Sequence, residues 1–248
     1  MKFSSFLLIV YLLVFNYSNA QDIIKTNSGD ITIQPITHGT LVLTYKSETI
    51  YVDPYGGADG FIGVANPDFI LITDIHGDHL NLETLNGLDT KKTQFIVPQS
   101  VADKMPDLYK NQITILTNGQ SIHRSGLYIS AIPMYNLPES PDAKHIRGRG
   151  NGYIIKMGGK NIYISGDTED IVEMRNLRDI DVAFVCMNLP YTMDVNQAAS
   201  AVLEFKPKIV YPYHYKGRPD FSDIEKFKSL VNAGDDKIEV RIRDWYKN

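Results

Sequence analysis

The stretch Leu71-Ile72-Thr73-Asp74-Ile75-His76-Gly77-Asp78-His79 decides how the rest of the sequence is interpreted. It continues an apolar run from Phe69 that has the length and composition of a short buried strand. Four side chains that can bind a metal ion then follow within six residues: Asp74, His76, Asp78 and His79. Carboxylates and imidazoles packed this closely repel each other or compete for protons unless a cation is shared. Because α/β proteins place their chemistry where strands end in loops, we expect a functional site here rather than a solvated loop.

The first 20 residues have the pattern of a secretory signal peptide. Lys2 supplies a positive charge, an apolar core runs from Phe6 to Phe15, and small residues end at Ala20, where a signal peptidase could cut. The apolar run is short for a membrane-spanning helix, and an uncleaved anchor is the alternative. We therefore expect a periplasmic or secreted protein that begins near Gln21 and has no membrane association after cleavage.

Residues 21–248 have the length of one domain, and no low-complexity tract or linker divides them. Without Lys2 this part carries 24 basic and 29 acidic residues, a net charge of −5. A mildly acidic chain lacks the general basic face that nucleic acids require, so we expect no dedicated nucleic-acid partner. Cys186 is the only cysteine and cannot form an internal disulfide. Its place in the apolar run 182–187 predicts a buried, inert thiol.

Apolar segments of strand length recur along the whole chain. Strands are expected at residues 31–33, 40–45, 50–52, 69–72, 95–97, 113–116, 127–132, 152–156, 161–165, 182–185, 209–211 and 238–242. Helices are expected at residues 82–88, 99–104, 195–205 and 221–231, the third of them preceded by Asp194 and carrying Gln197 as a capping box. Two strand-rich halves with few helices suggest an α/β protein in which two sheets pack face to face with helices outside.

Several of the later strands also lead to single residues that can bind metal. Asn136, Asp167 and His214 each follow an expected strand, and His145 lies in the loop after Asn136. Any one of them alone would more often be a turn, cap or structural residue. Their order, and their repeated placement after buried strands, make a shared site the better explanation.

Together these motifs resemble the metallo-β-lactamase superfamily of metal-dependent hydrolases. The first motif of that family is His-x-His-x-Asp-His, and residues 74–79 match it except at the first position. Gly166-Asp167-Thr168 matches the motif of the metal-bridging aspartate. Pro212-Tyr213-His214-Tyr215 matches the late Pro-x-His-Tyr of a branch that includes ascorbate-6-phosphate lactonase-like enzymes. The segments Asp53-Pro54, Pro133-Met134-Tyr135-Asn136 and Tyr191-Thr192-Met193-Asp194 are also similar to that branch, and the similarity runs from Ile31 to His214.

The resemblance implies a four-layer αβ/βα sandwich of two mixed sheets and a metal-dependent hydrolase. It assigns His76 to a first metal, Asp78, His79 and His214 to a second, and Asp167 to the position between them. Imidazole and carboxylate ligands fit zinc, and we expect two ions, although the large share of oxygen ligands leaves manganese, iron or a single metal open. Two cations can hold a hydroxide that cleaves an ester, lactone or phosphoester bond. Asp78, or a metal-bound water, is the candidate for handling the proton of the leaving group.

Two positions depart from the pattern of the family. Asp74 stands where a histidine is usual, and it can still bind a hard or borderline cation. The third ligand of the first metal falls at His145 or Asn136, and His145 could instead contact substrate. Asp53 is expected to accept the free N–H of a metal-bound histidine and so fix its tautomer. His38 either lines the pocket behind the ligands or is structural, and His123, in a polar turn, receives no role.

Basic side chains flank the expected site in loops: Lys144, Arg147, Arg149, Lys216 and Arg218. Cations beside a metal centre can hold a phosphate or carboxylate, so we expect a small anionic substrate contacted by Arg147 and Arg149. The substrate itself does not follow from the resemblance, since one fold hosts many chemistries. Two other functions are open: a non-catalytic periplasmic metal- or ligand-binding protein, and a phosphodiesterase acting on lipid or nucleotide fragments. The sequence predicts no oligomeric state.

Overall fold

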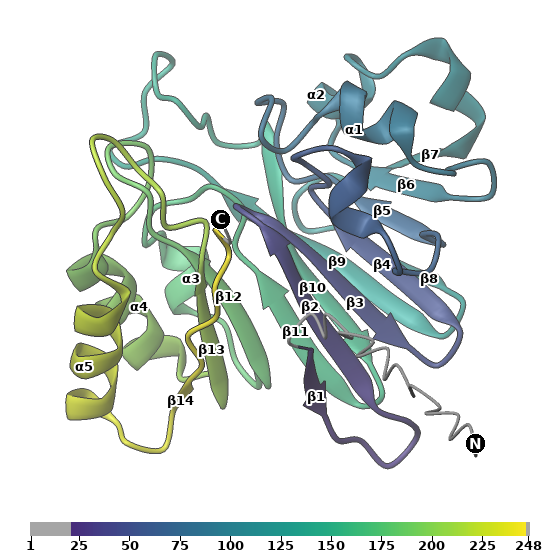
Figure 1. The fold of residues 1–248 in the computed structure, drawn as a ribbon. Coiled ribbons are helices and arrows are strands. Elements are labelled where there is room, and N and C mark those ends of the chain that lie inside the picture. Colours follow the sequence, from purple (N-terminus) through teal and green to yellow (C-terminus); the bar gives the residue numbers. More distant parts are fainter. Residues whose placement is uncertain (1–20, 247–248) are drawn as a thin grey trace, which may run out of the picture.

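The computed structural model describes residues 21–246, so the expected signal peptide lies outside the described residues. Its strands form two seven-stranded sheets with helices on their outer sides (Figure 1). The first sheet contains, in spatial order, β1 (Asp22–Ile24), β2 (Ile31–Thr37), β3 (Thr40–Tyr45), β4 (Glu48–Val52), β5 (Phe69–Leu71), β6 (Gln94–Val97) and β7 (Ile113–Ile115). The second contains β8 (Ser121–Arg124), β9 (Leu127–Met134), β10 (Gly150–Met157), β11 (Lys160–Ile164), β12 (Val182–Cys186), β13 (Ile209–Tyr213) and β14 (Glu239–Val240). This is the expected α/β sandwich.

The helices divide between the two sheets. The first half of the chain contributes α1 (Leu82–Gly87), α2 (Gln99–Ala102) and the 3₁₀ helices η1 (Ala58–Phe61) and η2 (Asp107–Gln112). The second half contributes α3 (Val172–Arg175), α4 (Val195–Phe205) and α5 (Ile224–Gly234), which lie outside β12–β14 in Figure 1. Helix α4 has the expected bounds because the capping box of Asp194 and Gln197 fixes its start. Among residues 21–246, no helix is long and apolar enough to cross a membrane.

Both sheets are mixed, and their topology brings the candidate residues to one edge. Strands β1 to β4 pair antiparallel and β4 to β7 parallel. Strands β8 to β11 pair antiparallel and β11 to β14 parallel. Strand β2 therefore runs in the direction of β4 and β5, and β9 in the direction of β11, β12 and β13. The carboxyl ends of these strands lie at the same edge of their sheet, where the loops of the site begin.

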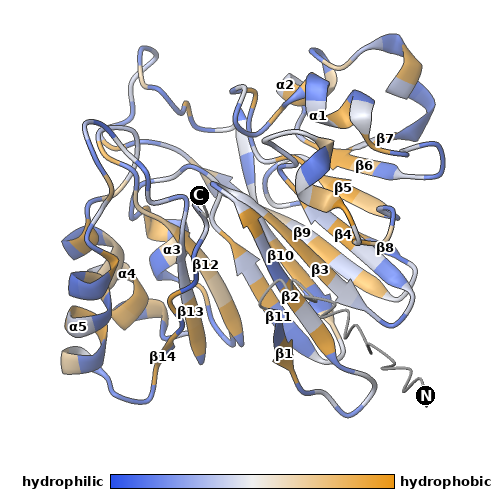
Figure 2. Cartoon of the chain, viewed as in Figure 1, coloured by the Kyte–Doolittle hydropathy of each residue, from blue (hydrophilic) through white to orange (hydrophobic). Residues whose placement is uncertain are grey.

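The alternation of side chains along the strands separates two cores. Leu41 and Leu43 of β3 belong to the large cluster that also contains Ile155 and Ile164 from the second sheet. Val42, which points the other way, belongs to a smaller cluster between the first sheet and its helices. Figure 2 shows the apolar residues concentrated along the strands and on the inner sides of the helices. The buried faces thus follow the period of two that the sequence displays.

Some elements differ from expectation. Strands β1 and β8 and helix α3 were not predicted, and His123 belongs to β8 rather than to a turn. Helix α5 begins at Ile224, not at Phe221, because Phe221 forms a β-bridge with Lys216 and the Asp223 carboxylate caps the helix by accepting from the Lys226 amide. Cys186 is a fully buried free thiol in β12, as its apolar surroundings predicted, and burial raises its pKa to about 12.

Candidate metal centre

Five of the six histidines of the chain gather with carboxylates at the shared edge of the two sheets. They form three groups, and within each group the ligand atoms lie within 4.8 Å of one another: Asp74, His76 and His145; His79, Asp167 and His214; and His38, Asp78 and His214. The last two groups share His214. The sixth, His123, lies elsewhere against Tyr128, with a ring-centroid distance of 4.4 Å. All residues expected to bind metal, except Asn136, are members of these groups.

A single turn after β5 places the first four residues. The backbone amides of His79 and Leu80 both donate to the carbonyl oxygen of His76, at 3.0 and 2.8 Å, which closes the turn around Gly77. Asp167 follows β11 after Gly166, whose φ of 61° is in the left-handed region. A Cβ at Gly166 would lie 2.6 Å from the Met134 sulfur, so conformation and space both require glycine there.

The hydrogen bonds of Asp53 fix the orientation of His79. One carboxylate oxygen accepts from the His79 Nδ1 at 2.8 Å and from the Thr73 hydroxyl at 2.6 Å, while the other accepts from the Thr73 amide at 2.7 Å. With its proton on Nδ1, His79 directs a bare Nε2 toward Asp167 Oδ2, 3.4 Å away. The hydrogen bond expected from Asp53 to a histidine of the first motif is therefore present.

Asn136 orients His145 instead of joining the cluster. Its side-chain oxygen accepts from the His145 amide at 2.7 Å and from Nδ1 of the ring at 3.1 Å, while its nitrogen donates to the Tyr191 carbonyl at 2.8 Å. The His145 Nε2 then lies 3.3 Å from Asp167 Oδ2 and 3.9 Å from Asp74 Oδ2. His145 and Asn136 were the two candidates for the third ligand of the first metal. His145 belongs to the cluster, whereas Asn136 contacts His145 and is not a member of it.

The buried polar atoms at the centre match a metal site. His79 Nε2, His145 Nε2, His214 Nε2 and Asp167 Oδ1 are buried and have no hydrogen-bond partner among the described residues 21–246. Bare nitrogens that face carboxylate oxygens are unfavourable unless a proton or a cation lies between them. Burial would lower the pKa of His79, but Asp167 and Asp53 outweigh it and hold that pKa well above its ordinary value. The cluster therefore attracts positive charge, and its nitrogen and oxygen donors are those that zinc accepts.

Asp74 is held by an arginine that was expected to contact substrate. Its fully buried carboxylate lies 2.5 Å from His76 Nδ1 and accepts two hydrogen bonds of 3.2 Å from Arg149. Arg147 forms ion pairs with Glu139 and Glu173 at 2.9 and 2.6 Å. Neither arginine lines the cavity at the metal cluster, so the expectation that Arg147 and Arg149 bind substrate gains no support from this cavity and stays a prediction.

A cavity of about 490 Å³ opens above the cluster. Its lining includes five of the clustered residues and Tyr191, which belongs to a segment that resembles the family branch. It also contains residues that the sequence did not single out: Thr37, Tyr55, Asn188, Gly217 and Tyr246. Three cations, Lys144, Lys216 and Arg218, complete the wall. Within residues 21–246 none of the three has a carboxylate at ion-pair distance, whereas Arg147 and Arg149 do. The cavity thus combines an anionic floor with a cationic wall.

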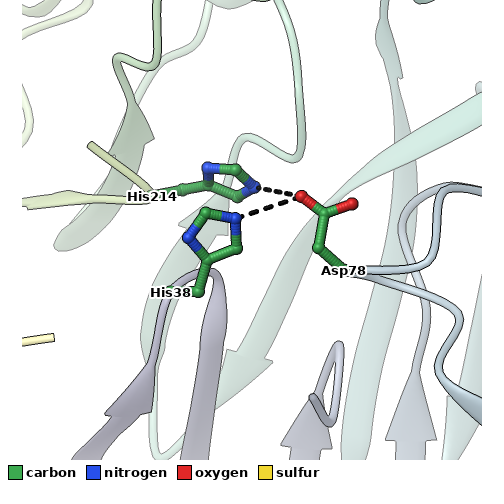
Figure 3. A group of neighbouring side chains, drawn as sticks. All are labelled: His38, Asp78 and His214. Atoms are coloured by element: carbon green, nitrogen blue, oxygen red, sulfur yellow. Dashed lines mark hydrogen bonds and ion pairs between the residues drawn. The ribbon is translucent and has the colours of Figure 1, made fainter. Parts of the chain in front are cut away.

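His38 and His214 converge on one oxygen of Asp78 (Figure 3). Their Nε2 atoms lie 3.1 and 3.4 Å from Asp78 Oδ2. Burial would raise the pKa of Asp78, but its close contacts with His214 and His38 outweigh it and lower that pKa well below its ordinary value. Asp78 is therefore an anion at neutral pH, and His38 lines the cavity in direct contact with a candidate ligand.

A sandwich of two mixed sheets with a buried histidine–aspartate cluster at their common edge defines the class of metal-dependent hydrolases with the metallo-β-lactamase fold. The family described as "Beta-lactamase superfamily domain" matches residues 32–214, and the chain belongs to that superfamily.

Similar proteins agree with this assignment. A UPF0173 metal-dependent hydrolase of Pyrococcus abyssi is 32% identical over 211 residues, which cover 78% of this chain and 88% of the relative. A crystal structure from Parabacteroides distasonis, described as a metal-dependent hydrolase, is 39% identical with a TM-score of 0.80 and covers 90% of this chain and 98% of its own. The metallo hydrolase Igni18 of Ignicoccus hospitalis, at 24% identity and a TM-score of 0.73, covers 86% and 95% and shares the fold. None of these three is described as a lactonase, so that branch stays a prediction.

Proposed function

We propose that this metal-dependent hydrolase cleaves an ester, lactone or phosphoester bond in a small anionic substrate, with two zinc ions as cofactor. One observation carries the proposal: two buried atoms without a hydrogen-bond partner, His145 Nε2 and Asp167 Oδ1, belong to residues that line a cavity, and three cations without carboxylate partners among residues 21–246 line the same cavity. The floor suits metal-assisted hydrolysis, and the wall suits a negatively charged group.

The donor atoms divide into two sets. Asp78, His79 and His214 would hold one ion and Asp74, His76 and His145 the other, with Asp167 facing both sets through its contacts with His79, His214 and His145. When bound, such ions polarise the scissile group and lower the pKa of a coordinated water towards neutrality. The chain prepares the site by fixing the tautomers of its ligands through Asp53 and Asn136.

The cationic wall supports the choice of an anionic substrate. Lys144 Nζ lies 5.9 Å from the centre of the Tyr191 ring, and Lys216 Nζ lies 6.0 Å from that of Tyr246. These aromatic faces keep the ammonium groups at the cavity without neutralising them. A phosphate or carboxylate that enters would find charged donors in Lys144, Lys216 and Arg218. Asp78 is an anion at neutral pH and its lowered pKa makes it a weak base, so its handling of the leaving-group proton stays a prediction.

Metal content and turnover test the proposal together. Residues 21–248, purified without chelator, should contain two equivalents of zinc per chain and hydrolyse members of a panel of anionic lactones and phosphoesters. Asp167→Ala and His214→Ala should lose both metal and turnover, while His123→Ala, the histidine outside the cluster, should keep both. Full activity in Asp167→Ala would contradict the proposal. Metal without turnover on any substrate would favour the alternative of a non-catalytic binding protein.

We also propose that the protein is exported to the periplasm or secreted. The support is the charge, apolar core and small-residue pattern of residues 1–20. Expression of the full chain with fractionation of the cells should yield a mature form whose N-terminal sequencing starts near Gln21. An intact N-terminus in the cytoplasmic fraction would contradict export and leave the hydrolase assignment untouched.

A further inference from the structure

The segment that contains Trp245 and Tyr246 reaches the candidate metal centre. The backbone amide of His38 donates to the carbonyl oxygen of Trp245 at 3.1 Å, and the indole of Trp245 is fully buried in the core. Tyr246 follows directly and lines the cavity. The buried Trp245 therefore places the side chain of Tyr246 beside the turn between β2 and β3.

The hydroxyl of Tyr246 joins two parts of the cavity wall. It accepts a hydrogen bond from the backbone amide of Lys216 at 3.1 Å and lies 2.7 Å from His38 Nδ1. On the other side of the ring, His38 Nε2 lies 3.1 Å from Asp78 Oδ2. Because an ionised carboxylate only accepts hydrogen bonds, Nε2 carries the proton of the neutral ring. Nδ1 is then an acceptor, and the Tyr246 hydroxyl donates to it.

His38 and His214 are also fixed to each other. The His214 amide donates to the carbonyl oxygen of His38 at 3.1 Å, and the ring centroids are 3.9 Å apart. Both residues have a positive φ, 54° and 46°, which is uncommon for residues other than glycine. A Cβ at Gly39 would lie 2.8 Å from His214 Cδ2, so the turn is shaped to receive that ring. Strained backbone held in this way is typical of functional sites.

We propose that Tyr246 is a positioning residue of the metal centre, which holds His38 in the tautomer that donates to Asp78 and thereby fixes the Asp78 carboxylate beside His214. This inference rests on the proposed function, in that the cluster holds metal. The last described residue of the chain then completes a site whose other members come from both sheets. Through the Lys216 amide, the same hydroxyl links the cationic wall to the metal-binding floor.

Tyr246→Phe tests this inference because it keeps the ring and removes only the hydroxyl. Long-range ¹H–¹⁵N spectra of histidine-labelled, metal-free protein should show the His38 proton on Nε2 in the parent and redistributed toward Nδ1 in the variant. The variant should bind zinc about tenfold more weakly in a chelator competition, the lower end of the loss expected for an outer partner of a ligand. Tyr215→Phe is the matched control, since the hydrogen bonds that its hydroxyl forms within residues 21–246 are to backbone of the same C-terminal segment, the Arg243 carbonyl and the Trp245 amide.

The outcomes separate the inference from the function on which it rests. Unchanged zinc affinity in Tyr246→Phe, or an Nδ1–H tautomer of His38 in the parent, would overturn the role of Tyr246 while the hydrolase stands. An equal loss in Tyr215→Phe would also overturn it, because docking of the C-terminal segment would then explain the effect. A parent protein that binds no zinc would instead contradict the proposed metal centre.

Discussion

Arg149 donates two hydrogen bonds to the Asp74 carboxylate, from Nε to Oδ1 and from Nη2 to Oδ2, each 3.2 Å long. The side chain of Asp74 is 0% exposed and that of Arg149 is 18% exposed. A carboxylate paired with a guanidinium is close to neutral as a unit, as is the histidine that the superfamily usually has at this position. The pair thus presents an oxygen donor without adding net charge to the proposed first metal site.

Replacing Arg149 by methionine should destabilise the metal-free protein by about 3 kcal/mol, because a buried carboxylate loses its partner. A metal ion at the first site would compensate the charge of Asp74, so the loss should be clearly smaller in the zinc-loaded protein. Denaturant unfolding with and without chelator measures the difference. Asp74→Asn added to Arg149→Met should recover part of the stability. Equal losses in the two metal states would show that no cation reaches Asp74.

Asp53→Asn should weaken zinc binding by about 10- to 100-fold. Its carboxylate accepts from the His79 ring and from the amide and hydroxyl of Thr73, and an amide in the same position must point its NH₂ at one of these donors. A chelator competition measures the affinity. Asp68→Asn is the control, since Asp68 accepts from the Thr49 amide within the first sheet and lies outside the metal-binding groups. Equal affinity in Asp53→Asn and the parent would remove Asp53 from the support of the site.

Lys216→Gln should raise KM for an anionic substrate roughly tenfold and leave KM for a neutral ester of similar size unchanged, because one charge-assisted contact in the cavity wall is lost. Steady-state kinetics with the paired substrates provide the test. Arg147→Gln should change neither KM, since Arg147 forms ion pairs with Glu139 and Glu173 outside the cavity. A rise in KM for both substrates alike would mean that Lys216 shapes the cavity without recognising charge.

Much of the fold was predictable because its signals are local. The capping box marks the first residue of α4, and the paired glycines Gly158 and Gly159 mark the hairpin between β10 and β11. Strand β8 escaped prediction because it is an exposed edge strand with a single apolar residue, Ile122, among Ser121, His123 and Arg124. A period of two cannot be recognised from one apolar position.

The clustering of most candidate metal ligands was predictable for the same reason, because residues 74–79, Asp167 and His214 follow recognisable strands. Their supporting partners were not. Asn136 was grouped with the ligands because both types of residue follow strands, and only the packing shows that its oxygen faces His145. Tyr246 meets His38 across 208 residues of sequence, and no local pattern indicates such a contact. The basic residues in the loops after the strands suggested that cations lie near the site. Which of these cations reach the cavity depends on the ion pairs that form in the folded chain.

Asp181→Asn should lower stability at neutral pH but not in acid. Burial would raise the pKa of Asp181, but hydrogen bonds from Lys208, from the Asn161 amide and from Lys160 outweigh it and lower the pKa. A carboxyl with a depressed pKa contributes its stability above its ordinary pKa, and that contribution is lost as the pH falls through the folded value. We expect the free energy of unfolding of the variant to be about 1 kcal/mol lower than that of the parent at pH 7, because its hydrogen bonds are no longer strengthened by the charge of the carboxylate.

Urea midpoints of the parent and Asp181→Asn should therefore converge between about pH 4 and about pH 2. Lys160 and Lys208 lie 3.3 and 2.8 Å from the same Asp181 oxygen, so high salt should narrow the difference at pH 7 as well. Asp236→Asn is the control, because its exposed carboxylate forms no hydrogen bond or ion pair within residues 21–246, and it should match the parent throughout. A deficit of constant size from pH 7 to pH 2 would mean that the side chain of Asp181 acts through its shape and not through its charge.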